Sequence, residues 1–155
     1  MWTMQSHALI SENVKTNERN EIVDITPAVR RIVQKHGVRD GMAVVYVPHT
    51  TAAVTINENA DPDVKRDMLA KLSAMIPKDE KYYEHGEGNS DSHLKTALVG
   101  NSAMVLIEQG NLVLGTWQGI YFCEFDGPRS REFYVKLVDF RSECRHVIET
   151  TEMSS

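Results

Sequence analysis

The last third of the chain constrains the fold most strongly, because its apolar residues recur in the two-residue rhythm of β-strands. Such runs cover residues 103–108, 112–115, 117–125 and 132–140. The first two runs are separated by Gln109-Gly110-Asn111, and the last two by Asp126-Gly127-Pro128. Turn residues between alternating runs are typical of antiparallel hairpins. We therefore predict a locally connected antiparallel meander here.

Two helices are predicted earlier in the chain from their end signals. Thr26 precedes Pro27 at a helix start, where the threonine side chain would accept from free backbone donors, and Gly37 suits a left-handed helix end. Asp61 is expected to cap a second helix, whose apolar residues recur at helical spacing until Pro77. This spacing predicts that the second helix faces the core.

A third helix is expected after the polar stretch 78–89. Either Ser90 or Asp91 would cap it, and Gly100 would end it. This helix carries Leu94, Ala97 and Leu98.

The first half also contains strand-like segments. Residues 2–10 and 22–25 are expected to form a strand pair around the polar turn 15–20, and residues 42–47 and 52–56 to form two more strands. Together these elements predict an α+β fold, with helices inserted among mostly antiparallel strands.

Size and charge limit the possible functions. The 155 residues contain no linker or repeat, so we expect a single domain spanning 1–155. The net charge of −5 argues against general affinity for nucleic acid, which requires positive charge on the protein. The sequence has neither a membrane-spanning apolar run nor a secretory signal at its start, so we expect a cytoplasmic location and no membrane partner. Cys123 and Cys144 lack a metal or redox spacing and are expected to be reduced thiols.

Three of the six histidines stand in segments suited to chemistry. His49 follows an apolar strand and begins a small, polar stretch, whereas His85 and His93 flank a loop rich in glycine and polar residues. Three neutral imidazoles with one open position are the ligand set of many catalytic zinc sites. We therefore predict His49, His85 and His93 as metal ligands. The other histidines, namely His7, His36 and His146, lie in ordinary structural contexts.

Polar residues after His49 extend this prediction. Thr50, Asn57 and Glu58 could face a pocket beside the histidines, although turns and helix starts also favour such residues. Asp61 is better explained as a helix cap.

A second polar group surrounds the predicted turn at Gly127-Pro128. Glu124, Asp126, Arg129 and Arg131 crowd this turn. An arginine there could bind carboxylate or phosphate, or could merely pin the turn through Asp126. Trp117 lies in a predicted strand, where an indole is more often part of the core than a stacking platform.

Three ordered motifs carry a resemblance to a known family. They are HTTAAVTINENADPDV, YYEHGEGNSDSHLKTALVG and GNLVLGTWQGIYFCEFDGPRSRE. With the spacing between them, they resemble the YjbQ family, small proteins described as secondary thiamine-phosphate synthases. The resemblance covers nearly the whole chain. It implies an α+β fold with a β-sandwich-like arrangement, a homotrimer, and a site at the motif histidines.

The resemblance also implies a reaction. Hydroxymethylpyrimidine diphosphate would be joined to thiazole phosphate, releasing pyrophosphate, and this activity could be secondary to another role. A divalent metal, zinc or magnesium, and Arg129 would stabilise the leaving diphosphate. The site residues expected on this basis are His49, Glu58 and Glu124 for catalysis, and Thr50, Asn57, Asn89, Asp126 and Arg129 for binding a phosphorylated small molecule.

Two other functions remain open from the residues alone. The first is a metal-dependent hydrolase, in which Glu58 or Glu124 would act as the base for a bound water. The second is a non-enzymatic protein that binds a phosphorylated metabolite in the same pocket.

Overall fold

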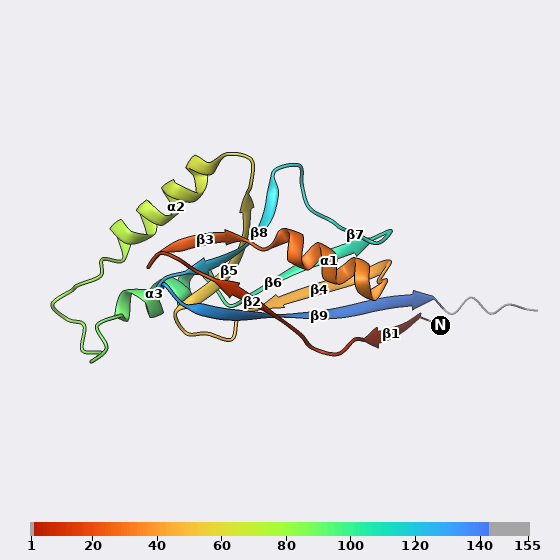
Figure 1. The fold of residues 1–155 in the computed structure, drawn as a ribbon, viewed down its shortest axis with the longest axis horizontal. Coiled ribbons are helices and arrows are strands. Elements are labelled where there is room, and N and C mark those ends of the chain that lie inside the picture. Colours follow the sequence, from red (N-terminus) through yellow and green to blue (C-terminus); the bar gives the residue numbers. More distant parts are fainter. Residues whose placement is uncertain (1, 143–155) are drawn as a thin grey trace, which may run out of the picture.

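The computed structural model describes residues 2–142, which form two sheets and three helices (Figure 1). The elements in chain order are β1 Trp2–Ser6, β2 Ile10–Lys15, β3 Glu21–Asp24, α1 Thr26–His36, β4 Asp40–Tyr46, β5 Ala52–Glu58, α2 Pro62–Met75, α3 Ser90–Val99, β6 Ser102–Glu108, β7 Asn111–Leu112, β8 Gln118–Glu124 and β9 Ser130–Ser142.

The larger sheet is organised around the long strand β9. Its order is β1-β9-β4-β6-β7, and β2 also pairs with β9. The smaller sheet has the order β3-β8-β5. All of these pairings are antiparallel. The predicted α+β class with mostly antiparallel sheets and three inserted helices is thus confirmed.

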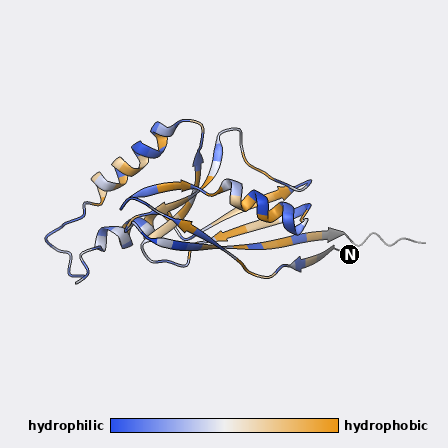
Figure 2. Ribbon diagram, in the orientation of Figure 1, coloured by the Kyte–Doolittle hydropathy of each residue, from blue (hydrophilic) through white to orange (hydrophobic). Residues whose placement is uncertain are grey.

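Most of the core lies between the two sheets, together with α1. The alternation of β4 directs Ala43 and Val45 inward, where they are fully buried with Phe122 of β8. The opposite face of the smaller sheet buries Tyr121 and Phe125 against apolar residues of α2 and α3. β8 is therefore buried on both faces, which explains its nearly continuous apolar sequence. Figure 2 shows the hydrophobic residues concentrated on the strands, whereas the loop between α2 and α3 is hydrophilic.

The predicted ends of α1 and α2 agree with the structure, except for one cap. Gly37 ends α1 in the left-handed conformation, at φ 65°. The Asp61 side chain caps α2 by accepting from the backbone N–H of Asp63 at 2.9 Å. Thr26 does not cap α1, because its hydroxyl instead accepts from the backbone N–H of Ile120 at 2.8 Å. A tertiary contact thus replaces the local one.

The prediction that α2 faces the core is confirmed in part. Leu69 and Leu72 pack against the core cluster on the outer face of the smaller sheet, although α2 contains no fully buried residue. In α3, Leu94 and Leu98 are exposed, and Asn89 rather than Ser90 or Asp91 occupies the N-cap position. The buried face of α3 is polar and consists of Asp91, Ser92, Lys95 and Thr96. Charged partners on other segments compensate this burial, as described below.

Two predicted strand pairings are also wrong. β1 and β3 belong to different sheets, and β8 and β9 do not form a hairpin. The turn between β8 and β9 crosses from one sheet to the other, because other segments hold its backbone. Phe125 donates to the carbonyl of Thr51 at 3.1 Å, and Gly127 donates to that of Arg19 at 3.0 Å. The β6–β7 hairpin is as predicted.

Within residues 2–142, none of the helices combines the length and the apolar character needed to cross a bilayer.

Candidate functional site

The loop between β4 and β5, which carries His49, is held by the side chain of Asn101. Its amide Nδ2 donates to the carbonyl oxygens of Val47 at 3.0 Å and His49 at 2.9 Å, and more distantly to that of Ala52 at 3.4 Å. The backbone of Val47 in turn donates to the carbonyl of Asn101 at 2.8 Å. Asn101 therefore orders the loop. No sequence pattern predicts this role, because Asn101 lies about fifty positions after the loop.

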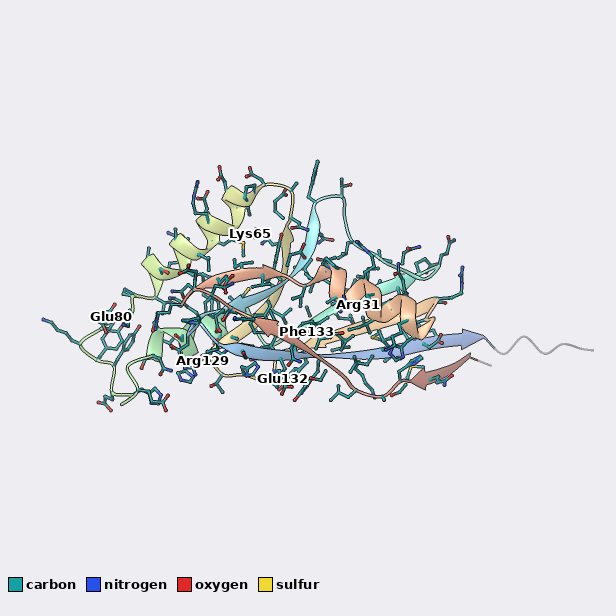
Figure 3. All side chains as sticks on the ribbon, viewed as in Figure 1. Arg31, Lys65, Glu80, Arg129, Glu132 and Phe133 are labelled. Carbon is teal, nitrogen blue, oxygen red and sulfur yellow. The ribbon has the colours of Figure 1, made fainter. Side chains whose placement is uncertain are left out.

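One ring nitrogen of His49 is engaged by the backbone of β9. Nε2 lies 3.0 Å from the carbonyl oxygen of Glu132 and 3.2 Å from its nitrogen. Figure 3 labels Glu132, which lies near the start of β9. Either neutral tautomer can use this contact, so Nδ1 is the nitrogen left for a ligand. Burial, and then the charge of Arg131, lower the pKa of His49 more than the contacts with Glu132 raise it. The imidazole is therefore neutral near pH 7.

His49 and His93 share a cavity of about 490 Å³. One face of α3 lines the cavity with His93, Thr96 and Ala97, which lie three and four positions apart and therefore on the same side of the helix. The remaining lining residues are Tyr46, Pro48, Thr50 and Asn101. The hydroxyl of Thr96 is buried and has no hydrogen-bond partner among the described residues. The described residues leave the hydrogen-bonding capacity of this hydroxyl unused, which is unfavourable for a buried polar atom. We call this cavity the histidine pocket.

His85 belongs to a neighbouring hollow rather than to the histidine pocket. That hollow has a volume of about 520 Å³ and is lined by Tyr82, Tyr83 and His93 among others. The rings of His85 and His93 stand edge to face, with their centroids 5.2 Å apart. His93 thus borders both spaces, while His85 is 46% exposed and lies 3.7 Å from the Glu87 carboxylate.

The three histidines do not converge on one point within a single chain. Among residues 2–142, no group of three His, Cys, Asp or Glu side chains is positioned to hold a metal ion. The structure brings together His49 with His93, and His93 with His85, as two separate contacts.

Glu124 is buried in an ion pair rather than exposed to the histidine pocket. Its carboxylate accepts from Nη2 of Arg131 at 2.6 Å, from Nε at 2.9 Å, and from the hydroxyl of Thr16 at 2.8 Å. Arg131 also donates to the hydroxyl of Thr51 at 2.8 Å. These contacts occupy the carboxylate and give Glu124 a structural position that links β8, β9 and the His49 loop.

Asp126 contacts both Asn89 and Arg129 directly, while the expected role of these three residues in binding a substrate stays a prediction. The Asp126 carboxylate accepts from the Asn89 amide and from the Arg129 guanidinium, each at 2.9 Å. Burial raises the pKa of Asp126, but the hydrogen bonds from Asn89 and Arg129 outweigh it and hold this pKa below its usual value. Arg129 pins the turn and still exposes half of its side chain. The amide oxygen of Asn89 is buried and unpaired among the described residues.

Sequence reasoning missed the charged cluster beneath α3. Arg19 binds both carboxylate oxygens of Asp91 at 2.9 Å, and Lys95 donates to the same carboxylate at 3.1 Å. Ser92 donates to the carbonyl of Phe125 at 2.6 Å. The cluster fixes α3 against the end of β8 and so positions His93. The only sequence signal was polar residues at helical spacing opposite Leu94.

Asn57 and Glu58 lie far from the histidine pocket. They end β5, and the predicted cap Asp61 follows them, whereas the His49 loop precedes Ala52. Six residue steps in a strand correspond to about 20 Å. Figure 1 shows β5 running from the side of α3 to the top of the view. Thr50, by contrast, lines the pocket.

The remaining candidates divide between confirmed and corrected predictions. Trp117 is 61% exposed, so the prediction that its indole belongs to the core is wrong. Cys123 is a free, buried thiol, and burial raises its pKa to about 12, which makes it unreactive.

The rings of His7 and His36 pack edge to face, with their centroids 5.6 Å apart. Cys144 and His146 lie outside the described residues.

Comparisons with known proteins agree with this architecture. The family model described as UPF0047 protein YjbQ-like matches residues 11–140. A UPF0047 protein of Methanocaldococcus jannaschii is 56% identical over 84% of this chain and 94% of its own length. The UPF0047 protein YugU of Bacillus subtilis is 52% identical over 81% of this chain and 95% of its own length.

Solved structures show the same fold. An uncharacterised YjbQ/UPF0047 family protein from Clostridium acetobutylicum superposes with a TM-score of 0.81 at 55% identity, covering 83% of this chain and 98% of its own. A protein of unknown function from Sulfolobus solfataricus gives a TM-score of 0.83 at 31% identity, covering 88% and 99% of the two chains. With sequence motifs, family model and fold in agreement, this chain belongs to the YjbQ (UPF0047) family.

Proposed function

We propose that this protein is a thiamine-phosphate-synthase-like transferase that acts on phosphorylated small molecules in the histidine pocket. The observation that carries the proposal is the pairing of His49 and His93 with the unpartnered hydroxyl of Thr96 in one cavity. These groups supply hydrogen-bond donors in a partly buried site, where donors stabilise developing negative charge most strongly. This activity could be secondary to another role of the same pocket.

The proposed reaction requires charge stabilisation more than acid or base chemistry. The carbon–oxygen bond between the pyrimidine methylene and the diphosphate breaks, and pyrophosphate leaves with the electron pair. The ring nitrogen of thiazole phosphate then forms the new carbon–nitrogen bond. When Nε2 of His49 accepts from the Glu132 N–H, Nδ1 bears the proton and can donate to a phosphate oxygen. Thr96 and His93 add donors, and the half-exposed Arg129 adds positive charge at the same end of the molecule.

The sequence predicts a zinc or magnesium ion, but the described residues of one chain do not offer enough ligands to hold it. The described residues place no three ligands around one point. The two histidines of the pocket would need further ligands from a second subunit or from the substrate. The proposal therefore assigns no step to a metal, and the ligand role of His49, His85 and His93 stays a prediction that elemental analysis of the purified protein tests.

The synthase activity has a direct test. Purified protein given both phosphorylated precursors should form thiamine phosphate, measured by chromatography. His49→Ala and His93→Ala should each lower the rate at least about 100-fold, the scale on which positioned donors act. His36→Ala, which removes a histidine at the end of α1, should keep the full rate. If wild-type protein forms no more product than His49→Ala, the synthase proposal is wrong.

The non-enzymatic alternative rests on the same unpaired Thr96 hydroxyl. A metabolite that fills the pocket without reacting would stabilise the folded state, so it would raise the melting temperature of wild-type protein more than that of Thr96→Val. The hydrolase alternative finds less support, because Glu124 is occupied by Arg131 and Thr16, and Glu58 lies at the far end of β5.

We also propose that the protein assembles as a homotrimer, through the face of the larger sheet that points away from α1. Tyr46, Met104 and Leu106 are 47%, 59% and 53% exposed on this face. Within residues 2–142 no helix covers it, since the core residues of these strands point to the other side. An exposed apolar sheet face of this kind marks an interaction site, and in a closed ring of three copies it would contact a different surface of the neighbouring copy. The number of copies follows from the family resemblance. Tyr46 also lines the histidine pocket, so the interface would reach the site.

Sedimentation equilibrium tests the assembly. The mass should be three times the 17.5 kDa of one chain. Replacing both Met104 and Leu106 with lysine should give a folded monomer, because two charges would be buried at the interface. Met75→Lys, at an equally exposed methionine of α2, should leave the mass unchanged. A wild-type mass of 17.5 kDa would refute the assembly.

A further inference from the structure

A second hollow lies at the opposite end of β5 and β8 from the histidine pocket. Its volume is about 330 Å³, and the start of α1, the residues after β5 and the turn before β8 surround it. Its principal lining residues are Asp24, Thr26, Arg30, Asn59, Trp117 and Gln118. This volume is within the range of small-ligand sites. None of the proposed chemistry of the histidine pocket uses these residues.

The wall of this hollow is ordered by Asn59. Its backbone N–H donates to the carbonyl of Trp117 at 2.6 Å, and its side-chain oxygen accepts from the Tyr121 hydroxyl at 2.5 Å. Its amide nitrogen donates to Asp24 at 3.2 Å. A Cβ at position 119 would lie 3.0 Å from the Asn59 side chain, so Gly119 leaves the space that Asn59 fills. The wall is therefore set before any ligand arrives.

Trp117 stands exposed on a closed turn beside the hollow. Gln118 closes the turn, because its backbone N–H donates to the carbonyl of Gly115 at 3.0 Å and its side chain accepts from the Gly115 N–H at 2.8 Å. The indole is 61% exposed although it is the largest apolar side chain of this region. An exposed indole on such a turn provides a flat surface on which a planar ring can stack.

The hollow contains the acid Asp24, whose carboxylate accepts from the backbone N–H of Thr26 at 2.9 Å and from the Asn59 amide at 3.2 Å. Arg30 supplies positive charge to the same hollow. Among the described residues it forms no ion pair, whereas its neighbour Arg31 binds Glu12 at 3.2 Å. Arg30 also lies in the first half of α1, whose amino end carries partial positive charge. A free guanidinium of this kind is well suited to phosphate.

We propose that this hollow binds a nucleoside monophosphate, with the base stacked on Trp117 and the phosphate bound by Arg30. The indole would stack on the planar base, and the guanidinium would bind the anionic phosphate. The Gln118 amide nitrogen could donate a hydrogen bond to the edge of the base. The site is independent of the transferase function proposed above, because it uses other residues at the other end of the smaller sheet.

Trp117 itself reports on the binding. The sequence contains two tryptophans, so a Trp2→Phe background leaves Trp117 as the single indole. Titration with adenosine monophosphate should quench its fluorescence to saturation. Arg30→Gln should weaken binding at least about tenfold, the scale of a lost charge-assisted hydrogen bond. Arg31→Gln, which removes the same charge from the same helix, should bind within about twofold of the background, since distant exposed charges are screened.

Three further measurements distinguish binding at this hollow from non-specific attraction of anions and from the synthase activity. Adenosine should bind at least about tenfold more weakly than its monophosphate, because it lacks the anion. His49→Ala should bind adenosine monophosphate normally even if it loses synthase activity. Calorimetry with Trp117→Leu should show weaker binding without a change in melting temperature. The proposal is overturned if quenching does not saturate, or if Arg30→Gln and Arg31→Gln bind equally well.

Discussion

Replacing Glu124 with alanine is expected to lower the free energy of unfolding by about 3–5 kcal/mol, because it leaves a buried guanidinium without its partner. Glu124 is fully buried, and the Arg131 side chain is only 8% exposed. The pair joins the end of β8 to β9, and Thr16 and Thr51 complete its hydrogen bonds. Urea denaturation followed by circular dichroism measures the change.

An exposed ion pair provides the control for Glu124. Glu12→Ala removes the partner of Arg31, whose side chain is 62% exposed, so it should cost less than about 1 kcal/mol. The double variant Glu124→Leu/Arg131→Met should recover much of the lost stability, because it leaves no unpaired buried charge. A cost for Glu124→Ala as small as that for Glu12→Ala would mean that the buried pair is not maintained in solution.

Acid is expected to destabilise the protein through Asp91 as the pH falls below about 4. Burial raises the pKa of Asp91, but hydrogen bonds from Arg19 and Lys95, together with their charges, outweigh it and hold this pKa below its usual value. The unfolded chain therefore takes up the proton first. The stabilisation is complete above the unfolded pKa and is lost as the pH falls through the folded pKa.

Asp91→Asn tests this contribution. At pH 6 it should lower the free energy of unfolding by about 3–5 kcal/mol, because it leaves Lys95 buried without an acid. Its stability should also fall less steeply than that of wild type between pH 5 and pH 2, a range set by ordinary carboxyl values of about 4. Asp63→Asn, at a 62% exposed carboxylate of α2, should follow the wild-type curve. Parallel curves for Asp91→Asn and wild type would show that Asp91 does not set the acid response.

Elements with local signals were predicted well. The ends of α2 follow from Asp61 and Pro77, and the end of α1 follows from Gly37, because a cap or a left-handed glycine acts within a few residues. Thr26 shows the limit of such signals. It has a good capping side chain, yet its hydroxyl binds the backbone of β8, which lies more than ninety positions away.

α3 shows how tertiary partners can reverse a hydrophobic pattern. Leu94 and Leu98 recur at helical spacing but are exposed, and the helix buries Asp91 and Lys95 instead. Burying a carboxylate is unfavourable unless it is paired, and the partner that pairs it, Arg19, comes from a loop seventy-two positions earlier. Periodicity within a helix contains no information about that arginine.

The sequence by itself determined the family and, with few exceptions, the strands and helices, and it singled out His49 and His93 as candidate site residues. Only the tertiary structure decided that these two share a pocket while Asn57 and Glu58 stand at the far end of β5, and that Glu124 is held by Arg131. It also decided that Trp117 faces solvent. The reason is physical: turns, caps and alternation act between near neighbours in the chain, whereas sheet order and charge pairing depend on contacts between segments that the sequence places far apart.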